Sequence, residues 1–409
     1  MAKKQPQLIA GLSLGDRQLT LAAGFVHDQS RLIVRALQTV PSRGIERGVL
    51  SDPIECSDAV ARLIREVEKS LSVRISKVTA ALQGGGLKSY NADTSIPIPD
   101  PTVGISKKEV ERVVAACKSL SLDYDRQIIH SFERGFTVDG QAGIKDPVGL
   151  SGKKLGAELH LVTAQNLAVQ NLLRVINRAG VEVDQLVLPG LAASESVLAD
   201  LDRDLGVSLV YIGEYQTEGF LFTDGVPRES FLVPWGLDHL AESFSRTLKL
   251  PRANAEQLLE QVKTLEMKPE WAAVPLRVQS GSLVRTFPQE QVTSFLSAKS
   301  NEFLEKIKRK LEESPFFRES ASGVVMVGEL AHLEGFLEAS EGSLNVPVRL
   351  GTVREVEIDS DLELGPQHTT VIGLLKHTFK RQALSRKTAP HSFWKRCADK
   401  AHLVLEEYF

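Results

Sequence analysis

The chain has 409 residues, of which 42% are hydrophobic and 25% are charged, and its formal net charge at pH 7 is −3. This length exceeds the size at which single hydrophobic cores usually divide, so we expect at least two lobes. The small negative charge argues against a basic nucleic-acid-binding protein, and no nucleic-acid partner is expected. The three cysteines are far apart and form no CxxC pair, which argues against a disulfide framework and favours a reducing compartment.

No segment of the sequence predicts a membrane span. The N-terminus, MAKKQPQLIAGLSLG, has two lysines but only a short apolar run with a polar continuation, so it is not expected to be a signal peptide. No uninterrupted apolar stretch reaches about 18 residues, the length that a spanning helix needs. Any association with a membrane is therefore expected to be peripheral.

Apolar runs separated by turn residues predict two similar units in the two halves of the chain. In the first half, a β-meander, a helix and a buried strand are predicted at 8–15, 18–26, 31–40, 56–71 and 77–83. In the second half, three strands, two helices and a further strand are predicted at 208–213, 218–225, 226–234, 238–249, 254–266 and 323–328. This recurrence favours a duplicated fold of two lobes with a nucleotide between them.

The region between the two halves, 84–162, is expected to be a compact subdomain and not a linker. It opens with three consecutive glycines and carries an amphipathic helical pattern around Cys117, which is expected to pack in a core. Further patterns predict a helix that ends before Gly180, a strand at 181–191 and a long helix at 290–313, whose basic face is expected to be solvated.

Five segments together resemble the FtsA family, actin-like proteins that tether the FtsZ ring to the membrane during bacterial cell division. They are PSRGIERGVLSD (41–52), VERVVAACKSL (110–120), GIKDPVGLSG (143–152), VDQLVLPGLAASESVL (183–198) and IGLLKHT (372–378). The resemblance covers nearly the whole chain.

This resemblance implies an α/β, actin-like two-lobed fold of the actin/Hsp70 ATPase-domain superfamily with the FtsA-type inserted subdomain 1C, which is SHS2-like. The implied subdomains are 1A at 1–83 and 163–205, 1C at 84–162, 2A at 206–230 and 313–379, and 2B at 231–312. A linker at 380–391 and a membrane-targeting amphipathic helix at 392–409 are expected to follow.

Actin-like ATPases hold phosphates with two glycine-rich β-hairpins whose backbone N–H groups face the anion. In the first loop here, GLSLGDR, Ser13 stands where the family has an acidic residue and Asp16 where it has a hydroxyl. In the second loop, YIGEYQ, Tyr211 replaces an aspartate and Gly213 is the one glycine that remains of three. The candidate nucleotide-binding residues, all in altered motifs, are Gly11, Ser13, Gly15, Asp16, Tyr211, Gly213, Glu214, Tyr215, Gln216, Glu256, Gly328 and Glu329.

Asp16 and Glu214 place negative charge where phosphates would lie. Two like charges about 4 Å apart repel by roughly 4 kcal/mol at an effective dielectric near 20, which predicts weak or absent ATP binding and no ATPase activity. Alternatively, magnesium or Arg17 turned inward rescues the site, or Glu214 and Glu329 are surface residues in remodelled loops. No HxH, HExxH, GxSxG or GxxxxGK[ST] pattern occurs, so no metal site and no other catalytic set is predicted. No cofactor is expected beyond weakly bound ATP with magnesium.

The C-terminal region predicts a membrane-binding helix. The segment KRQALSRKTAP (380–390) has the polar, basic composition of a linker, and from Lys376 to Lys400 there are eight Lys or Arg against one acidic residue. Aromatic anchors beside cations suit an interfacial helix, and the resemblance implies such a helix at the end of the chain. The alternative is a helix packed on its own domain. The candidate membrane-binding residues are Phe393, Trp394, Lys395, Arg396, Cys397, Lys400, Ala401, Leu405 and Tyr408.

The resemblance also implies the partners. The FtsZ C-terminal peptide is expected on subdomain 2B, with Arg277, Arg285 and Lys299 as candidate contacts, although lysine lacks the bidentate fork of arginine. Anionic lipids, further copies of the chain in filaments, and other division proteins through subdomain 1C are the other expected partners. The expected function is a division scaffold that tethers FtsZ filaments to the cytoplasmic face of the bacterial inner membrane at the division site. The alternatives are a nucleotide-switched FtsA ATPase, a PilM-type pilus-assembly adaptor and a sugar-kinase-like enzyme.

Overall fold

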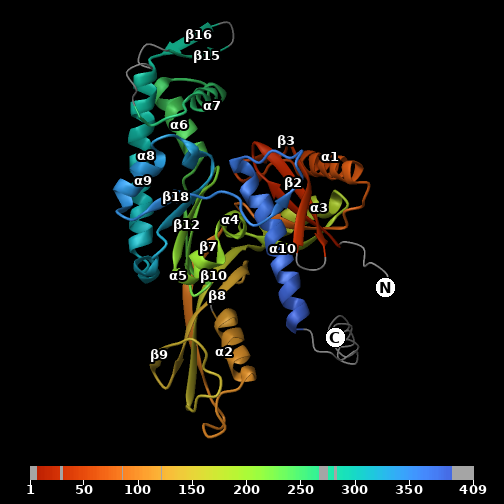
Figure 1. Ribbon diagram of the computed structural model, residues 1–409, viewed down its shortest axis with the longest axis vertical. Coiled ribbons are helices and arrows are strands. Elements are labelled where there is room, and N and C mark those ends of the chain that lie inside the picture. The colour runs from red at the N-terminus through yellow and green to blue at the C-terminus, as the bar shows by residue number, and fades with distance from the viewer. Residues whose placement is uncertain are drawn as a thin grey trace.

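The computed structural model describes residues 7–27, 31–84, 86–120, 122–266, 275–280 and 283–388. Two α/β lobes lie side by side, a four-stranded subdomain forms one end of the molecule, and a helical extension with a β-hairpin forms the other (Figure 1). The two-lobed α/β fold that the sequence predicts is confirmed.

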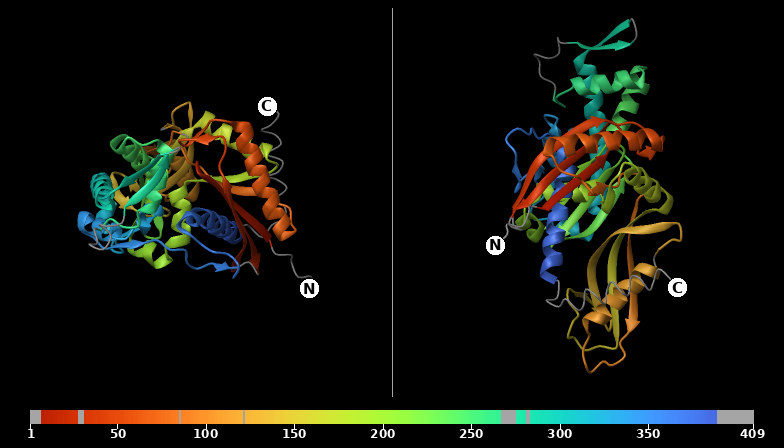
Figure 2. Two further views of the ribbon diagram at one scale, coloured as in Figure 1. Left: turned by 90° about the horizontal axis from the view of Figure 1, so that it is seen from above. Right: turned by 90° about the vertical axis from the view of Figure 1, so that its right-hand side faces the viewer.

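Lobe I is built on a six-stranded sheet in the order β11 (Glu182–Val187), β6 (Lys77–Ala81), β1 (Gln7–Leu14), β2 (Gln18–His27), β3 (Arg31–Pro41) and β19 (Glu357–Ile358). The strands β1, β2 and β3 form the predicted antiparallel meander, and β6 joins β1 in parallel. Helices α1 (Pro53–Leu71) and α3 (Asn166–Arg178) cover one face, and α10 (Thr369–Thr388) covers the other (Figure 2). Helix α1 begins where the Asp52 carboxylate accepts two backbone N–H groups of its first turn.

Lobe II repeats this arrangement on a five-stranded sheet in the order β14 (Val226–Val233), β13 (Thr217–Thr223), β12 (Val207–Ile212), β17 (Val324–Val327) and β18 (Val348–Leu350). Its first three strands again form an antiparallel meander, and β17 joins β12 in parallel. The duplication that the sequence predicts is therefore present in the structure.

The extension of lobe II consists of α6 (Leu237–Leu248), α7 (Arg252–Gln261), α8 (Gln289–Glu312) and the hairpin of β15 (Leu276–Ser280) with β16 (Leu283–Phe287). Its core includes Phe303 of α8, whose ring stacks on that of Trp235 with the centroids 4.0 Å apart. Shorter elements complete the chain: β4 (Ile45–Glu46), β5 (Val49–Leu50), α5 (Asp200–Leu205), η2 (Pro315–Glu319), η3 (Glu329–His332), α9 (Phe336–Leu344) and η4 (Pro366–His368).

Two helices cross between the lobes. The chain leaves the lobe I sheet through α4 (Pro189–Val197), which is buried along its whole length, and it returns to that sheet at β19, after which α10 packs against α4. The predicted strand at 181–191 is therefore wrong beyond Val187, because Pro189 occupies the first turn of α4. At the crossing, a Cβ on Gly373 would lie 1.8 Å from the carbonyl oxygen of Ala192, so only glycine fits.

Helix α10 continues to Thr388, through most of the segment that the sequence predicts as a linker at 380–391. Two of its basic residues pair with neighbouring elements: Lys380 lies 3.0 Å from a carboxylate oxygen of Glu195 in α4, and Arg381 donates to Gln185 and Asp184 of lobe I. These contacts explain why a segment with the composition of a linker is helical. The predicted membrane helix at 392–409 lies outside the described residues.

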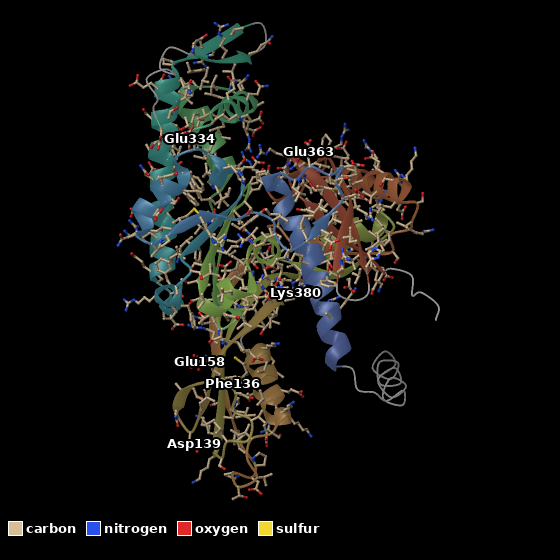
Figure 3. All side chains as sticks on the ribbon, viewed as in Figure 1. Phe136, Asp139, Glu158, Glu334, Glu363 and Lys380 are labelled. Carbon is tan, nitrogen blue, oxygen red and sulfur yellow. The ribbon has the colours of Figure 1, made fainter. Side chains whose placement is uncertain are left out.

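The inserted subdomain is a sheet in the order β7 (Lys88–Pro97), β10 (Lys154–Gln165), β8 (Arg126–Val138) and β9 (Gln141–Ile144), with α2 (Lys107–Leu120) on one face. Cys117, a residue of α2, is fully buried, which confirms its predicted core position. Figure 3 shows Phe136 and Asp139 in this subdomain, far from Glu363 of lobe I.

A buried histidine joins the inserted subdomain to lobe II. The Nε2 atom of His160 in β10 accepts the backbone N–H of Ser230 in β14 at 3.0 Å, and its Nδ1 atom lies 2.6 Å from Oδ1 of Asn91. Because Nε2 accepts a hydrogen bond, the ring is neutral and Nδ1–H donates to Asn91. Burial, helped by the nearby charge of Arg134, lowers the pKa of His160 to about 4.

We expect the docking of this subdomain to weaken as the pH falls from about 6.5 to about 4. In that window the unfolded histidine gains a proton while the folded one resists it, so up to about 3 kcal/mol of stability is lost. Denaturant unfolding between pH 7.5 and 4.5 measures this loss, and His160→Gln should reduce it. His27→Gln is the matched control and should leave it unchanged. An H160Q chain with the parent pH dependence would contradict the assignment.

Candidate functional site

The first candidate loop is a tight turn between β1 and β2. The Gly15 N–H donates to the carbonyl of Gln18 at 3.0 Å, which leaves Asp16 and Arg17 at the tip. The Asp16 carboxylate accepts the backbone N–H of Gly48 at 2.9 Å and a hydrogen bond from the Tyr215 hydroxyl. Burial raises the pKa of Asp16, and these two donors oppose that shift. The Asp16 carboxylate, which was predicted to repel phosphate, is thus hydrogen-bonded to donors of the protein itself.

The second candidate loop is the turn between β12 and β13, which closes when the Gly213 N–H donates to the Gln216 carbonyl at 3.1 Å. The carbonyl oxygens of Gly213 and Glu214 accept the first N–H groups of α6, from Leu237 and Asp238. Free N–H groups at a helix start would attract an anion. Here the loop itself satisfies them.

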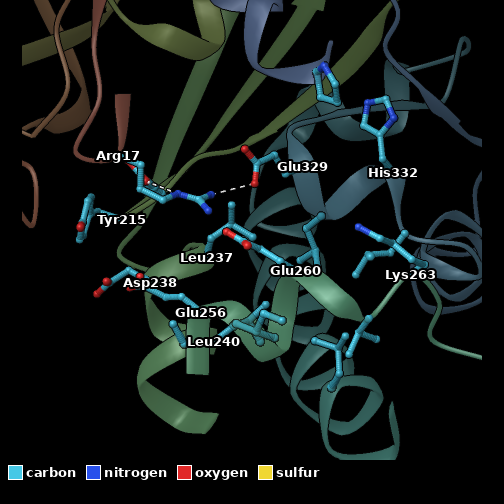
Figure 4. Close-up of a pocket in the computed structure, with 18 of the residues that line it drawn as sticks. Arg17, Tyr215, Leu237, Asp238, Leu240, Glu256, Glu260, Lys263, Glu329 and His332 are labelled. Atoms are coloured by element: carbon cyan, nitrogen blue, oxygen red, sulfur yellow. Dashed lines mark hydrogen bonds and ion pairs between the residues drawn. The ribbon is translucent and has the colours of Figure 1, made fainter. Parts of the chain in front are cut away.

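A bridge of ion pairs joins these loops across the cleft between the lobes (Figure 4). The Glu214 carboxylate accepts the Asp16 backbone N–H at 3.0 Å and the Arg17 Nε–H at 2.7 Å. Arg17 Nη2–H donates to the Glu329 carboxylate at 2.8 Å, as the dashed line in Figure 4 marks. We call Arg17, Glu214 and Glu329 the interlobe bridge.

The interlobe bridge changes the predicted electrostatics of the site. The Glu214 carboxylate binds a loop N–H and a guanidinium, which are the kinds of donor that a phosphate needs, so it acts as an internal anion. Arg17 is turned inward, as one alternative required, but its Nε–H and one Nη–H already hold carboxylates. Burial raises the pKa of Glu214, and Arg17 opposes that shift. A phosphate entering here must displace these pairs.

The bridge also divides the cleft. A cavity of about 300 Å³ lies on one side, lined by Ser13, Tyr211 and Gly328 among others. A cavity of about 420 Å³ lies on the other side, among α6, α7, α8 and η3. Arg17, Glu214 and Glu329 line both cavities.

The other predicted nucleotide-site residues have different positions. Gly11 lies within β1, where a Cβ would come within 2.9 Å of Leu374 in α10, so glycine there allows the helix to pack closely on the strand. Gln216 points away and donates to the buried Glu218. Glu256 lines the larger cavity and pairs with Arg252 at 2.9 Å.

Three residues of the site were missed by the sequence analysis: Gly48, Arg252 and Asp238. Arg252 pairs with Asp238 as well as with Glu256. The spacing of four residues between Arg252 and Glu256 is a local signal that could have predicted that pair. Nothing local links Gly48 to Asp16 or Arg252 to Asp238.

A family model described as the SHS2 domain inserted in FTSA matches residues 84–163. The FtsA protein of Pseudomonas aeruginosa is 27% identical over 379 residues, which cover 92% of this chain and 90% of the relative. The Escherichia coli K12 protein is also 27% identical, over 91% of this chain and 90% of its own length. By these matches the chain is similar to FtsA cell division proteins along nearly its whole length.

Solved structures agree with the actin-like fold. The "PilM-PilN type IV pilus biogenesis complex" matches with a TM-score of 0.63 and 17% identity, over 93% of this chain and 99% of that chain. ADP-bound MreB5 of Spiroplasma citri matches with a TM-score of 0.56 and 10% identity, over 94% of this chain and 99% of that chain. At these identities the matches show the fold alone.

The candidate FtsZ contacts of this chain do not form one cluster. In the β15–β16 register Arg277 lies opposite Thr286, and Arg285 lies opposite Val278, so the two arginines are on opposite faces of the hairpin. Arg285 donates to the carbonyls of Lys249 and Leu248 at the end of α6. Lys299 pairs with Glu302 at 2.8 Å. Arg277 is exposed, and its backbone exchanges hydrogen bonds with the Gln261 side chain.

Within the described residues, no helix is long and apolar enough to cross a membrane. The same residues contain no group of three or more His, Cys, Asp or Glu side chains placed to hold a metal ion.

Proposed function

We propose that this chain tethers FtsZ filaments to the cytoplasmic face of the inner membrane at the division site, and that it binds ATP weakly or not at all. The observation that carries the nucleotide part is the Glu214 carboxylate held at 2.7 Å by Arg17 and at 3.0 Å by the Asp16 N–H. A triphosphate would have to break both contacts and meet Glu329 as well. We also propose that the chain has no or negligible ATPase activity.

The tethering part rests on the similarity to FtsA proteins and on the C-terminal sequence. The segment 392–409 combines aromatic residues with cations, which suits an interfacial helix, and a short helix of this kind binds a membrane only weakly by itself. Several copies in one filament would bind together through avidity. The proposed partners are the FtsZ C-terminal peptide at the lobe II extension, anionic lipids, further copies of the chain, and other division proteins at the inserted subdomain.

Equilibrium binding of ATP with magnesium to the full chain, measured by calorimetry, tests the nucleotide part. We expect no binding at millimolar ATP. The triple variant E214G/Y215G/E329G frees Arg17 and the Asp16 N–H as phosphate donors and should gain measurable affinity. Micromolar affinity in the parent chain would overturn this part of the proposal and favour a nucleotide-switched FtsA.

Co-sedimentation with vesicles containing anionic lipid tests the tethering part. The full chain should pellet with vesicles and should carry FtsZ filaments with it, whereas F393E/W394E should stay in the supernatant. Leu201→Glu replaces another exposed apolar side chain, 67% exposed in lobe II, and should behave like the parent. Vesicle binding without retention of FtsZ would contradict the proposed FtsZ-tethering role and would favour the alternative, a PilM-type pilus-assembly adaptor.

A further inference from the structure

The larger cavity beside the interlobe bridge is not filled by the bridge. It measures about 420 Å³, a size that accommodates a small organic ligand. Its wall is largely aliphatic, with side chains from four different elements, among them Leu240, Leu259, Leu296 and Leu330. Figure 4 shows Arg17, Glu329, Glu260 and Lys263 around this cavity.

The charges around this cavity are unbalanced. Its carboxylates are those of Glu214, Asp238, Glu256, Glu260 and Glu329, and its cations are Arg17, Arg252 and Lys263. Five carboxylates and three cations leave a formal charge of −2. His332 also lines the cavity, and burial lowers its pKa, so it adds no positive charge at neutral pH.

Each arginine is shared between two carboxylates. Arg17 joins Glu214 and Glu329, and Arg252 joins Asp238 and Glu256. Neither arginine is therefore available to an incoming anion without loss of an ion pair. Glu260, the fifth carboxylate, makes no ion pair or hydrogen bond with the residues that the structure describes, and it is an exposed residue of the cavity lining.

We propose that this cavity binds a compact organic monocation, which consists of an aromatic or aliphatic moiety with one ammonium or guanidinium group. The apolar moiety packs against the leucines of α6, α7 and α8, and the charged group lies against Glu260 with Glu329 nearby. Negative ligands are disfavoured by the surplus of carboxylates, and neutral ones lack the ionic contact. This inference uses the interlobe bridge but not the proposed roles in tethering FtsZ or binding lipid.

Three probes with one ring system and different charges test this proposal. Tryptamine is a cation, tryptophol is neutral and indole-3-propionate is an anion, and each is titrated into the full chain by calorimetry at neutral pH. Tryptamine should bind at least about tenfold more tightly than tryptophol, and indole-3-propionate should bind most weakly. Added salt should reduce the difference between tryptamine and tryptophol, because the site is open to solvent.

A charge-neutralising substitution locates the site. Glu260→Gln should lower the affinity for tryptamine by about tenfold and leave that for tryptophol unchanged. Glu305→Gln is the matched control, because Glu305 is exposed on α8 and does not line the cavity. Equal affinities for the three probes, no tryptamine binding at millimolar concentration, or an equal loss in both variants would overturn the proposal. None of these outcomes bears on ATP binding or vesicle binding, which are measured separately.

Discussion

Gly373→Ala is expected to destabilise the protein by about 3 kcal/mol or more, although alanine is the better helix former. The added Cβ would lie 1.8 Å from the Ala192 carbonyl oxygen and 2.3 Å from its carbonyl carbon. Both atoms belong to the backbone of a fully buried helix, so the two helices must move apart. Because α4 and α10 are the crossing between the lobes, the loops that carry the interlobe bridge should move as well.

Gly342→Ala is the matched control for this prediction. Gly342 also lies within a helix, α9, but nothing lies within 4 Å of the Cβ that alanine would add. Helix propensity then decides the result, and we expect about 0.5–1 kcal/mol of added stability. Denaturant unfolding of both variants measures the two effects. A stabilised or unchanged G373A chain would show that the helices do not cross as closely as the structure has them.

Arg17→Glu is expected to open the cleft and to cost about 2 kcal/mol of stability. It removes both ion pairs of the interlobe bridge and places a fourth carboxylate beside those of Asp16, Glu214 and Glu329. The Coulomb repulsion is discounted because the side chains of Arg17 and Glu329 are 42% and 47% exposed. Amide hydrogen exchange should rise at the two loop turns, 15–18 and 213–216, and denaturant unfolding measures the loss.

Arg31→Glu is the matched control, because it reverses the charge of an arginine in another ion pair. Arg31 pairs with Glu357 within lobe I, and both side chains are more than half exposed, at 61% and 51%. Its reversal should cost less than about 1 kcal/mol and should not change exchange at the loops. High salt should shrink the loss in R17E, since the bridge is partly open to solvent. If both substitutions have equal effects, the bridge does not hold the lobes together.

The predictions that rest on the spacing of residues within a short segment are confirmed. The meander of β1, β2 and β3, the helix α8 and the burial of Cys117 follow from apolar spacing, which is a property of short segments. Two predictions were wrong at their ends. The strand at 181–191 stops before Pro189, and the linker composition at 380–391 is largely helical, because partners distant in sequence hold Lys380 and Arg381.

The sequence identifies the charged residues of the candidate site, but it does not predict the ion pairs that they form. The sequence identifies Asp16, Glu214 and Glu329 as charges that do not belong in a phosphate site. It suggests that these carboxylates repel the phosphates of ATP directly, whereas the structure pairs Glu214 and Glu329 with Arg17. Asp16 donates its N–H to a carboxylate 198 residues away, and Arg17 reaches one 312 residues away.

The sequence by itself therefore determined the strands and helices, the two lobes, the inserted subdomain and the altered loops, because each depends on residue type and local spacing. Only the tertiary structure decided that Glu214 occupies the loop donors as an internal anion and that a cavity with a surplus of carboxylates remains beside it. Those features depend on how the crossing of α4 and α10 sets the distance between the lobes. No local pattern encodes that distance.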